Sequence, residues 1–172
     1  ILLKFYIEKI MKISLENSFP GKTNSVEITE EMCDLNGHMN VLYYNQILSF
    51  GIDEFYSVEM GFTDQYFKSG YSTFTLEDNY RYLKECLLGE KVTPRYRLHK
   101  VNKKLMHIVA ILVNESDEMC ALYETVLGHI DMNSRKTSEM NEIFLKNLIM
   151  LMENNSKYKI DLDLRLNIKD LK

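Results

Sequence analysis

The sequence lacks the short motifs of several common enzyme classes. Its 172 residues contain no G-x-S-x-G, no G-x-x-x-x-G-K-[ST], no G-x-G-x-x-G and no H-E-x-x-H. Their absence argues against the common hydrolase, nucleotide-binding and zinc-protease classes. Cysteine is also scarce, since only Cys33, Cys86 and Cys120 are present and no C-x-x-C spacing occurs. We therefore expect no metal site and a reducing, cytoplasmic location.

Long runs of one charge or of apolar residues are absent as well. No basic run exceeds a pair such as Lys103-Lys104, and the formal net charge is -4, so nucleic acid is not an expected partner. Three charged residues interrupt the apolar residues 1–10, so we expect neither a signal-peptide core nor a membrane span there. We expect Met11 to be the natural start. The composition, 45% hydrophobic and 27% charged, is that of a globular domain.

Apolar periodicity predicts an α+β fold. Apolar residues at spacings of three and four run from Asn40, a favourable N-cap, to Gly61, a favourable stop, and predict a helix over 40–60. Gly51 in its middle is tolerable if another stretch of backbone must pass close by. A short strand is expected at 25–29 and four more after residue 70, which no helix separates, as an antiparallel meander. These four begin near Tyr71, Val92, Leu105 and Met119. On the first, Phe74, Leu76, Tyr80 and Tyr82 are expected to share one face.

The C-terminal residues carry two further patterns. A helix is predicted over 138–153, and strict alternation from Ile160 to Lys169 predicts an additional strand that must pair with something. The chain is therefore expected to consist of an N-terminal extension (1–23), a main domain (24–137) and a C-terminal helix and strand (138–172).

The turn between Asp34 and Val41 is the strongest functional signal. The sequence Asp-Leu-Asn-Gly-His-Met-Asn-Val places one carboxylate directly before the start of a helix. The N–H groups of a helix start can stabilise an oxyanion, and an ionised aspartate can act as a nucleophile or a base. A simple turn or capping role for Asp34 is the alternative. Cys33 is not expected to be a nucleophile, because the adjacent negative charge disfavours a thiolate.

The order of elements and this turn together resemble the hotdog-fold acyl-CoA thioesterases, in particular the hydroxybenzoyl-CoA thioesterase-like group. Within that group, residues 33–44, 104–107 and 124–131, followed by Arg135, are similar to the betainyl-CoA thioesterases. The resemblance covers 24–135 and implies a hotdog fold, in which an antiparallel sheet of about five strands wraps a long central helix. It also implies hydrolysis of a small, betainyl-CoA-like acyl-CoA to acid and CoA, without metal or organic cofactor. The implied assembly is a homodimer or homotetramer with the site at the subunit interface.

The resemblance also implies roles for individual residues. The catalytic carboxylate of the family falls on Asp34, and the backbone N–H that would hold the oxyanion falls on Val41. Gly37 suits the turn because a Cβ there could block the thioester. Four further residues complete the expected site: His38 and Asn40, which would orient Asp34 or bind the acyl group, and Tyr43 and Phe74, which would offer aromatic faces to a quaternary ammonium. The other histidines are expected to be packing residues.

Two alternatives remain open from the sequence. Hotdog enoyl-CoA hydratases carry a resembling Asp-x-Asn-Pro-x-His turn, but here Gly37 replaces the proline and His38 comes one residue early. A non-catalytic hotdog protein that binds an acyl thioester or another protein is the second alternative. Thiol release and hydration assays would separate the three functions.

Overall fold

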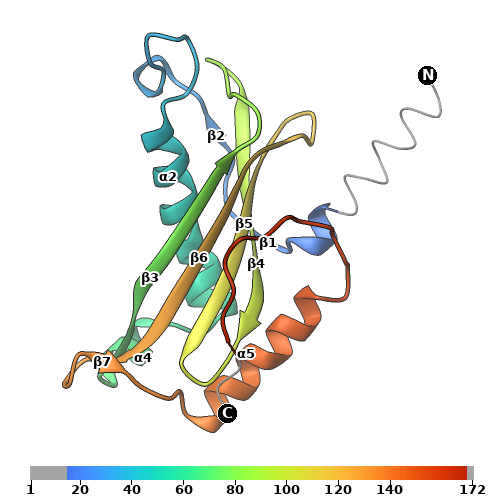
Figure 1. The fold of residues 1–172 in the computed structure, drawn as a ribbon. Coiled ribbons are helices and arrows are strands. Elements are labelled where there is room, and N and C mark those ends of the chain that lie inside the picture. The colour runs from blue at the N-terminus through green and yellow to red at the C-terminus, as the bar shows by residue number, and fades with distance from the viewer. Residues whose placement is uncertain (1–14, 170–172) are drawn as a thin grey trace.

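The computed structural model describes residues 15–169, in which a long helix lies along one face of an antiparallel sheet (Figure 1). The expected start at Met11 lies outside the described residues. Within the described range, no helix is long and apolar enough to cross a membrane. The strands are β1 (Gly21–Lys22), β2 (Val26–Glu27), β3 (Tyr71–Tyr82), β4 (Lys91–Val101), β5 (Leu105–Asn114), β6 (Met119–Asp131) and β7 (Lys136–Thr137). The helices are η1 (Glu30–Met32), α2 (Val41–Phe50), α3 (Ile52–Glu54), η2 (Phe55–Glu59), α4 (Asp64–Lys68) and α5 (Glu142–Asn155).

The central helix follows the predicted limits. Asn40 caps α2, and α2, α3 and the π-helical turn η2 follow one another closely as far as Gly61, whose φ of +84° ends the run. At Gly51 the close approach is made by a side chain and not by the backbone that was expected. The Tyr96 hydroxyl donates to the Leu48 carbonyl at 2.9 Å, directly beside Gly51. This contact ties the middle of the helix to β4.

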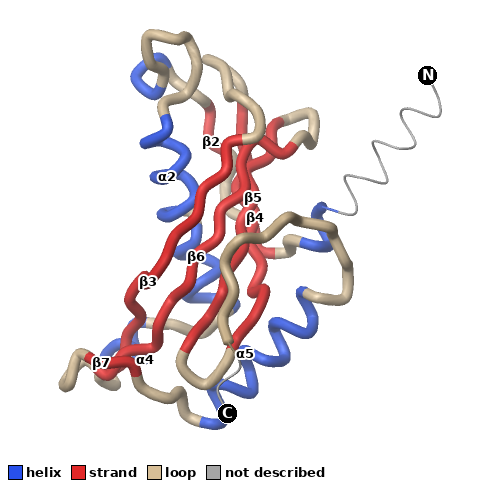
Figure 2. The backbone as a smooth tube through the Cα atoms, in the orientation of Figure 1, coloured by secondary structure: helices blue, strands red, loops and turns tan. Residues whose placement is uncertain are grey.

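The limits of the four long strands agree with those predicted from the sequence, but the first of them, β3, does not pair as predicted. The order is β1-β4-β5-β6-β3, with β2 also on β4 and β7 on β6 (Figure 2). Only β4, β5 and β6 form the expected meander, because β3 pairs with β6 rather than with β4. The 83–90 link crosses from one edge of the sheet to the other. Local periodicity cannot show this, since it identifies strands and not their partners.

A β-bulge corrects the predicted faces of β3. The register shifts between Thr75 and Glu77. The bulge inserts one residue, so the side chains after it change faces relative to those before it. As a result Tyr80 contacts the central helix, whereas Phe74 lies on the opposite face of the sheet. The prediction that these two side chains share a face is wrong.

The C-terminal helix is confirmed as α5, which packs against β4. The additional strand expected over 160–169 is not present in the structure, and this expectation is wrong. The chain there is extended and crosses the sheet face opposite the central helix (Figure 1). Its backbone is held by a side chain, since the buried Glu124 carboxylate accepts the N–H groups of Arg165 and Leu166 at 2.9 and 3.0 Å. The alternation therefore reflects an extended chain with one apolar side rather than a strand in a ladder.

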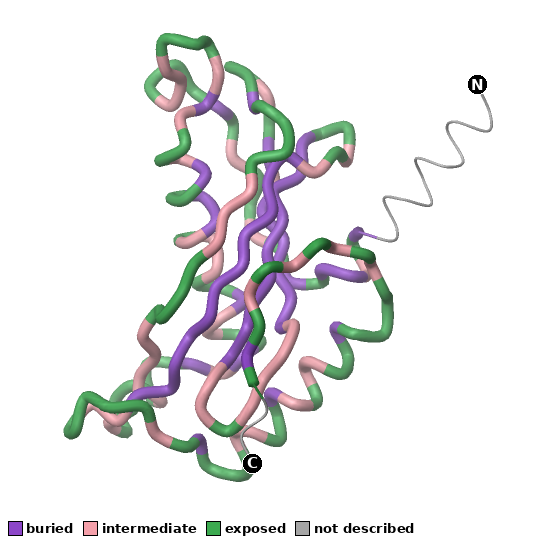
Figure 3. The backbone as a smooth tube through the Cα atoms, in the orientation of Figure 1, coloured by how far each residue is buried: buried purple, intermediate pink, exposed green. Residues whose placement is uncertain are grey.

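Two apolar clusters lie on the two faces of the sheet, whose central strands are buried along most of their length (Figure 3). The larger cluster joins the central helix and α5 to the sheet through residues such as Leu48, Tyr96 and Leu98. The smaller one joins Phe19 and the C-terminal segment to β5 and β6. The sheet is thus covered on both faces, and the end that carries the Asp34 turn projects beyond it.

Candidate active site

The turn that opens at Asp34 is closed by its own backbone. The Asp34 carbonyl accepts the Gly37 N–H at 2.9 Å, and the Asp34 N–H donates to the His38 carbonyl at 3.0 Å. One carboxylate oxygen of Asp34 accepts the Asn36 N–H at 2.8 Å. Gly37 has a φ of +81°, and an added Cβ would meet no atom of residues 15–169 within 4 Å, its two chain neighbours excepted. Glycine is therefore favoured here by the backbone conformation.

Hydrogen bonds tie this turn to the 83–90 link and to the helix. The Met39 N–H donates to the Cys86 carbonyl at 2.8 Å, and the Asn40 N–H donates to the Met32 carbonyl at 2.9 Å. The Tyr44 hydroxyl, one turn into α2, donates to the Lys84 carbonyl at 3.3 Å and accepts the Cys86 N–H at 3.2 Å. Burial raises the pKa of Tyr44, so its hydroxyl remains a neutral donor. The turn, the link and the helix start therefore hold one another in place.

In the first turn of α2, the N–H groups of Leu42 and Tyr43 are hydrogen-bonded and that of Val41 is not, within the described residues. The Asn40 side chain accepts the Leu42 N–H at 3.0 Å, and the Asn40 carbonyl accepts the Tyr43 N–H at 3.0 Å. Across residues 15–169, no acceptor is present for the Val41 N–H. Val41 as a residue is 53% exposed and lines a cavity at the surface. An N–H without a partner at the positive end of a helix dipole is suited to an anion or an oxyanion.

A cavity of about 270 Å³ lies beside this helix start. Among the predicted site residues, His38 and Val41 line it, and Asp34 does not. The sequence did not identify the remaining lining residues, which are Met39, Tyr44, Tyr82, Leu83, Lys84 and Glu85. The rings of Tyr44 and Tyr82 meet edge to face with centroids 5.1 Å apart. Tyr82 is displayed here because of the bulge in β3, which no sequence signal indicates. The His38 ring is anchored through Nδ1, 3.3 Å from the Met39 carbonyl oxygen.

The two aromatic residues predicted for the site, Tyr43 and Phe74, lie outside this cavity, as do Asp34, Gly37 and Asn40. Tyr43 is half-buried and packs against the larger apolar cluster. Phe74 lies on the opposite face of the sheet, where the Arg135 guanidinium sits 5.2 Å from the centroid of its ring. The monomer therefore brings His38 and Val41 together at one cavity but does not bring Phe74 to it.

A second cavity, of about 290 Å³, lies between the middle of the central helix and the sheet. It contains Asp53 and Asp78, and the Tyr123 hydroxyl donates to Asp78 at 2.9 Å. Tyr56 also lines it, and burial raises the pKa of Tyr56 to about 12. The cavity offers polar groups along the helix beyond the Asp34 turn.

The three histidines outside the turn have structural partners. His129 bonds through Nε2 to the Tyr66 hydroxyl at 2.8 Å and through Nδ1 to the Ser138 carbonyl at 2.9 Å. His107 lies 3.2 Å from the Glu124 carboxylate, close enough for an ion pair but not aligned for a hydrogen bond. His99 stacks edge to face on His107. Within 15–169, no group of three His, Cys, Asp or Glu side chains is arranged to hold a metal ion.

Comparisons with known proteins agree on one family. The Thioesterase-like superfamily profile matches residues 28–148. The chain is 29% identical over 118 residues to the betainyl-CoA thioesterase of Pseudomonas aeruginosa, covering 67% of this chain and 74% of that one. It is 26% identical over 134 residues to the L-carnitine dehydrogenase/betainyl-CoA thioesterase of Agrobacterium fabrum, covering 78% of this chain. The match spans little more than a quarter of that relative, 28% of its length.

Among solved structures, the fold is similar to that of a Staphylococcus aureus protein in complex with CoA. The TM-score is 0.73 at 23% identity, covering 87% of this chain and 98% of the other. This likeness confirms the hotdog fold expected from the sequence, with its central helix and antiparallel sheet.

Proposed function

The chain belongs to the thioesterase-like superfamily, and on that basis we propose that it hydrolyses the thioester of a small acyl-CoA to the free acid and CoA. The observation that carries the proposal is the unpartnered Val41 N–H at the start of α2, next to a turn that holds a carboxylate. The named thioesterase relatives and the CoA-bound structural neighbour support the substrate class.

The proposed chemistry needs only side chains and backbone groups of this chain together with water. Asp34 either attacks the thioester carbonyl, to give an anhydride that water then hydrolyses, or removes a proton from the attacking water. In both cases the C–S bond breaks and CoA leaves as the thiolate. The thiolate becomes the thiol by taking up the proton of the water that is consumed, through Asp34 in the base route and through solvent in the anhydride route. The carbonyl oxygen becomes negative in the transition state, where the Val41 N–H stabilises it. His38 and Asn40 hold the turn and the helix start.

For the acyl group, we propose a small substituent carrying a quaternary ammonium. Two relatives are named as betainyl-CoA thioesterases. Tyr44, Tyr82 and Glu85 line the cavity beside Val41. Lys84 lines it as well, and its ammonium is paired with the Glu118 carboxylate. Aromatic faces and a carboxylate are the groups that attract such a cation. These residues take the place of Phe74 in the acyl-binding role.

We also propose that a second copy of the chain completes the site. Asp34 and Val41 are at the projecting end of the molecule, and the 12-residue strand β3 ends the sheet without a neighbour on its outer side within 15–169. A long open edge is prone to pair with another chain, and Leu76 is exposed on it. A homodimer through β3 would shield this edge. Sedimentation velocity tests the proposal, and a monomer at micromolar concentration would contradict it.

Replacement of Asp34 tests the mechanism. Asp34→Asn keeps the oxygen that accepts the Asn36 N–H but removes the base or nucleophile. We expect thiol release from the best substrate of an acyl-CoA panel, betainyl-CoA included, to fall by about 10²- to 10⁴-fold. Asp131→Asn is a matched control, because Asp131 also accepts a backbone N–H two residues on, from Asn133 at 2.7 Å, but lies outside the candidate site.

The outcomes separate the rival functions. Full activity of Asp34→Asn would refute the mechanism, whereas equal losses in both variants would indicate a structural effect. Hydration of crotonyl-CoA without thiol release would favour the hydratase. Binding of acyl-CoA with neither activity would favour a non-catalytic protein. A cytoplasmic location, expected from the cysteine content, stays a prediction that fractionation of the source cells can test.

A further inference from the structure

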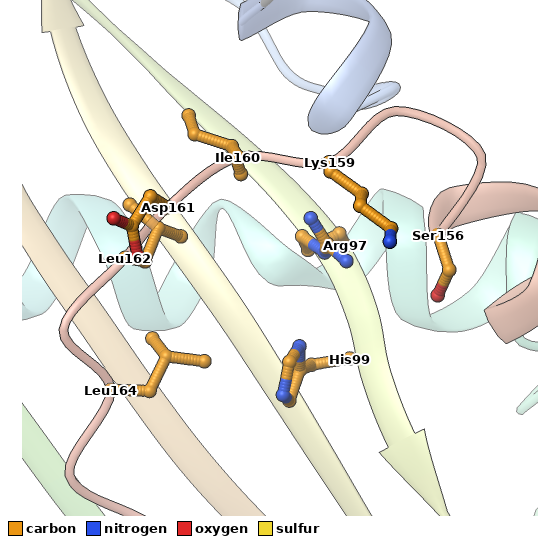
Figure 4. Close-up of a pocket in the computed structure, with 8 residues that line it drawn as sticks. All are labelled: Arg97, His99, Ser156, Lys159, Ile160, Asp161, Leu162 and Leu164. Atoms are coloured by element: carbon orange, nitrogen blue, oxygen red, sulfur yellow. The ribbon is translucent and has the colours of Figure 1, made fainter.

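A larger cavity, of about 640 Å³, lies on the face of the sheet opposite the central helix. Its floor is β4, and its outer wall is the extended C-terminal segment after α5 (Figure 4). Arg97 from β4, Ser156 and Lys159 gather at one side of this view. Leu162 and Leu164 lie at the other side. The cavity therefore has a cationic end and an end formed mainly by leucines, beside which Asp161 lies.

Arg97 is the unusual residue of this cavity. Its side chain is buried, with 6% of the residue exposed, and its Nε has no hydrogen-bond partner. No carboxylate within 15–169 pairs with it, and its guanidinium lies over the Phe19 ring, 5.7 Å from the ring centroid. Burial lowers the pKa of Arg97, but arginine remains charged at neutral pH. A buried and unpaired charge is costly, and a bound anion would remove the cost.

A neighbour on the same strand shows that the chain can neutralise such a charge. Arg95 precedes Arg97 by two residues, so it lies on the same face of β4. Its guanidinium pairs with the Glu16 carboxylate at 2.8 Å. Arg97, by contrast, has no such carboxylate partner among residues 15–169.

The carboxylates near the cavity either have other partners or lie away from Arg97. Glu124 is fully buried, and its carboxylate already accepts two backbone N–H groups of the C-terminal segment and lies 3.2 Å from His107. Asp161 lines the cavity, but it is exposed and lies with Leu162 on the side away from Arg97 (Figure 4). His99 lines the cavity as a neutral ring at neutral pH, because burial lowers its pKa to about 4. The cationic end therefore keeps its excess positive charge.

We propose that this cavity binds an aliphatic carboxylate. The carboxylate pairs with the Arg97 guanidinium, whose planar fork matches its two oxygens, with Lys159 and Ser156 beside it. The aliphatic chain lies against Ile160, Leu162 and Leu164. The volume falls within the range of about 300–1,000 Å³ typical of small-molecule sites. Inorganic phosphate would satisfy the cations but leave the apolar end unfilled. The site lies across the sheet from the central helix and does not depend on the proposed thioesterase function.

Calorimetric titration of the full chain with octanoate tests this proposal. Octan-1-ol is the control for the apolar chain, and inorganic phosphate is the control for the anion. We expect octanoate to bind at least tenfold more tightly than either. Arg97→Gln should weaken octanoate binding at least tenfold, whereas Arg95→Gln, which removes a paired arginine from the same face, should leave it within about twofold.

A second variant separates loss of octanoate binding from loss of the fold and from binding at another site. Lys159 is exposed, so Lys159→Gln should fold and should weaken octanoate binding severalfold even if Arg97→Gln fails to fold. Circular dichroism reports the fold of each variant. Octanoate affinity unchanged in both Arg97→Gln and Lys159→Gln would overturn the proposal, because the ligand would then occupy another site. No binding to the unmodified chain, or phosphate binding as tight as octanoate binding, would overturn it as well.

Discussion

Gly51 interrupts the central helix at a position where helix propensity and packing make opposite predictions. Its backbone is right-handed helical, with φ of −63° and ψ of −16°, so alanine could adopt the same conformation. Alanine is favoured over glycine in a helix by about 1 kcal/mol. From the isolated helix alone, Gly51→Ala would therefore be expected to stabilise the protein.

The packing around Gly51 opposes that gain. A Cβ built on Gly51 would overlap the Tyr96 hydroxyl, would lie 2.6 Å from the Ile47 carbonyl oxygen and would lie 3.2 Å from the Pro94 ring. The Tyr96 hydroxyl cannot move freely, because it donates to the Leu48 carbonyl at 2.9 Å. Overpacking of a core typically costs about 1–3 kcal/mol. We expect Gly51→Ala to lower the free energy of unfolding by about 1 kcal/mol net, which lowers Tm by about 2–4 °C for a domain of this size.

Urea denaturation of a double-mutant cycle measures the effect. Tyr96→Phe removes the hydroxyl that the new methyl would meet, and by itself costs about 1 kcal/mol for the lost hydrogen bond. In the Tyr96→Phe background, Gly51→Ala should be less destabilising by about 0.5–2 kcal/mol, within the range of coupling between residues in contact. If Gly51→Ala stabilised the unaltered chain, or if its effect were the same in the Tyr96→Phe background as in the unaltered chain, the packing argument would be refuted.

Two further predictions concern the helix start and the far face of the sheet. Asn40→Ala removes the cap on the Leu42 N–H and should cost about 1 kcal/mol of stability, as should Asn141→Ala, which uncaps α5 at Phe144. Only Asn40→Ala should also reduce thiol release, and equal activity of the two variants would contradict a role for this helix start. His99 has its pKa lowered from 6.5 to about 4 by burial and by nearby positive groups, so the unfolded chain binds more protons between these values. The free energy of unfolding should therefore fall by about 1–2 kcal/mol as pH drops from 6.5 to 4, a reduced value because the ring is partly exposed. His99→Gln should show a shallower slope in urea titrations, and an unchanged slope would contradict the assignment.

Local features of the sequence were sufficient for the elements of this fold. The central helix begins at Asn40 and ends at Gly61 as predicted, because capping and left-handed backbone preferences are properties of single residues and their neighbours. The four long strands were located for the same reason, since alternation is a local pattern. The turn at Asp34 was identified because its polar residues are contiguous in the chain.

The parts of the candidate site that come from distant segments could not be predicted. Tyr82 and the 83–85 link reach the cavity beside Val41 only because β3 pairs with β6 and the link crosses the sheet. One inserted residue at the Thr75/Glu77 bulge changes the face of each following side chain, and neither periodicity nor composition signals it. Phe74 was expected at the site on the basis of a face pattern that this bulge interrupts.

The sequence by itself located the helix start that carries the Asp34 turn, because capping and turn residues are contiguous in the chain. It also indicated the family and, through that resemblance, the hotdog arrangement. Only the tertiary structure decided which strand edge stays open and where the residues 160–169 lie. Their alternation is the same for a strand in a ladder and for a chain lying across an apolar sheet face. The N–H groups of Arg165 and Leu166 are bound by the carboxylate of Glu124, 41 and 42 residues earlier in the sequence. A contact over that separation depends on how the sheet is assembled, so no local pattern encodes it.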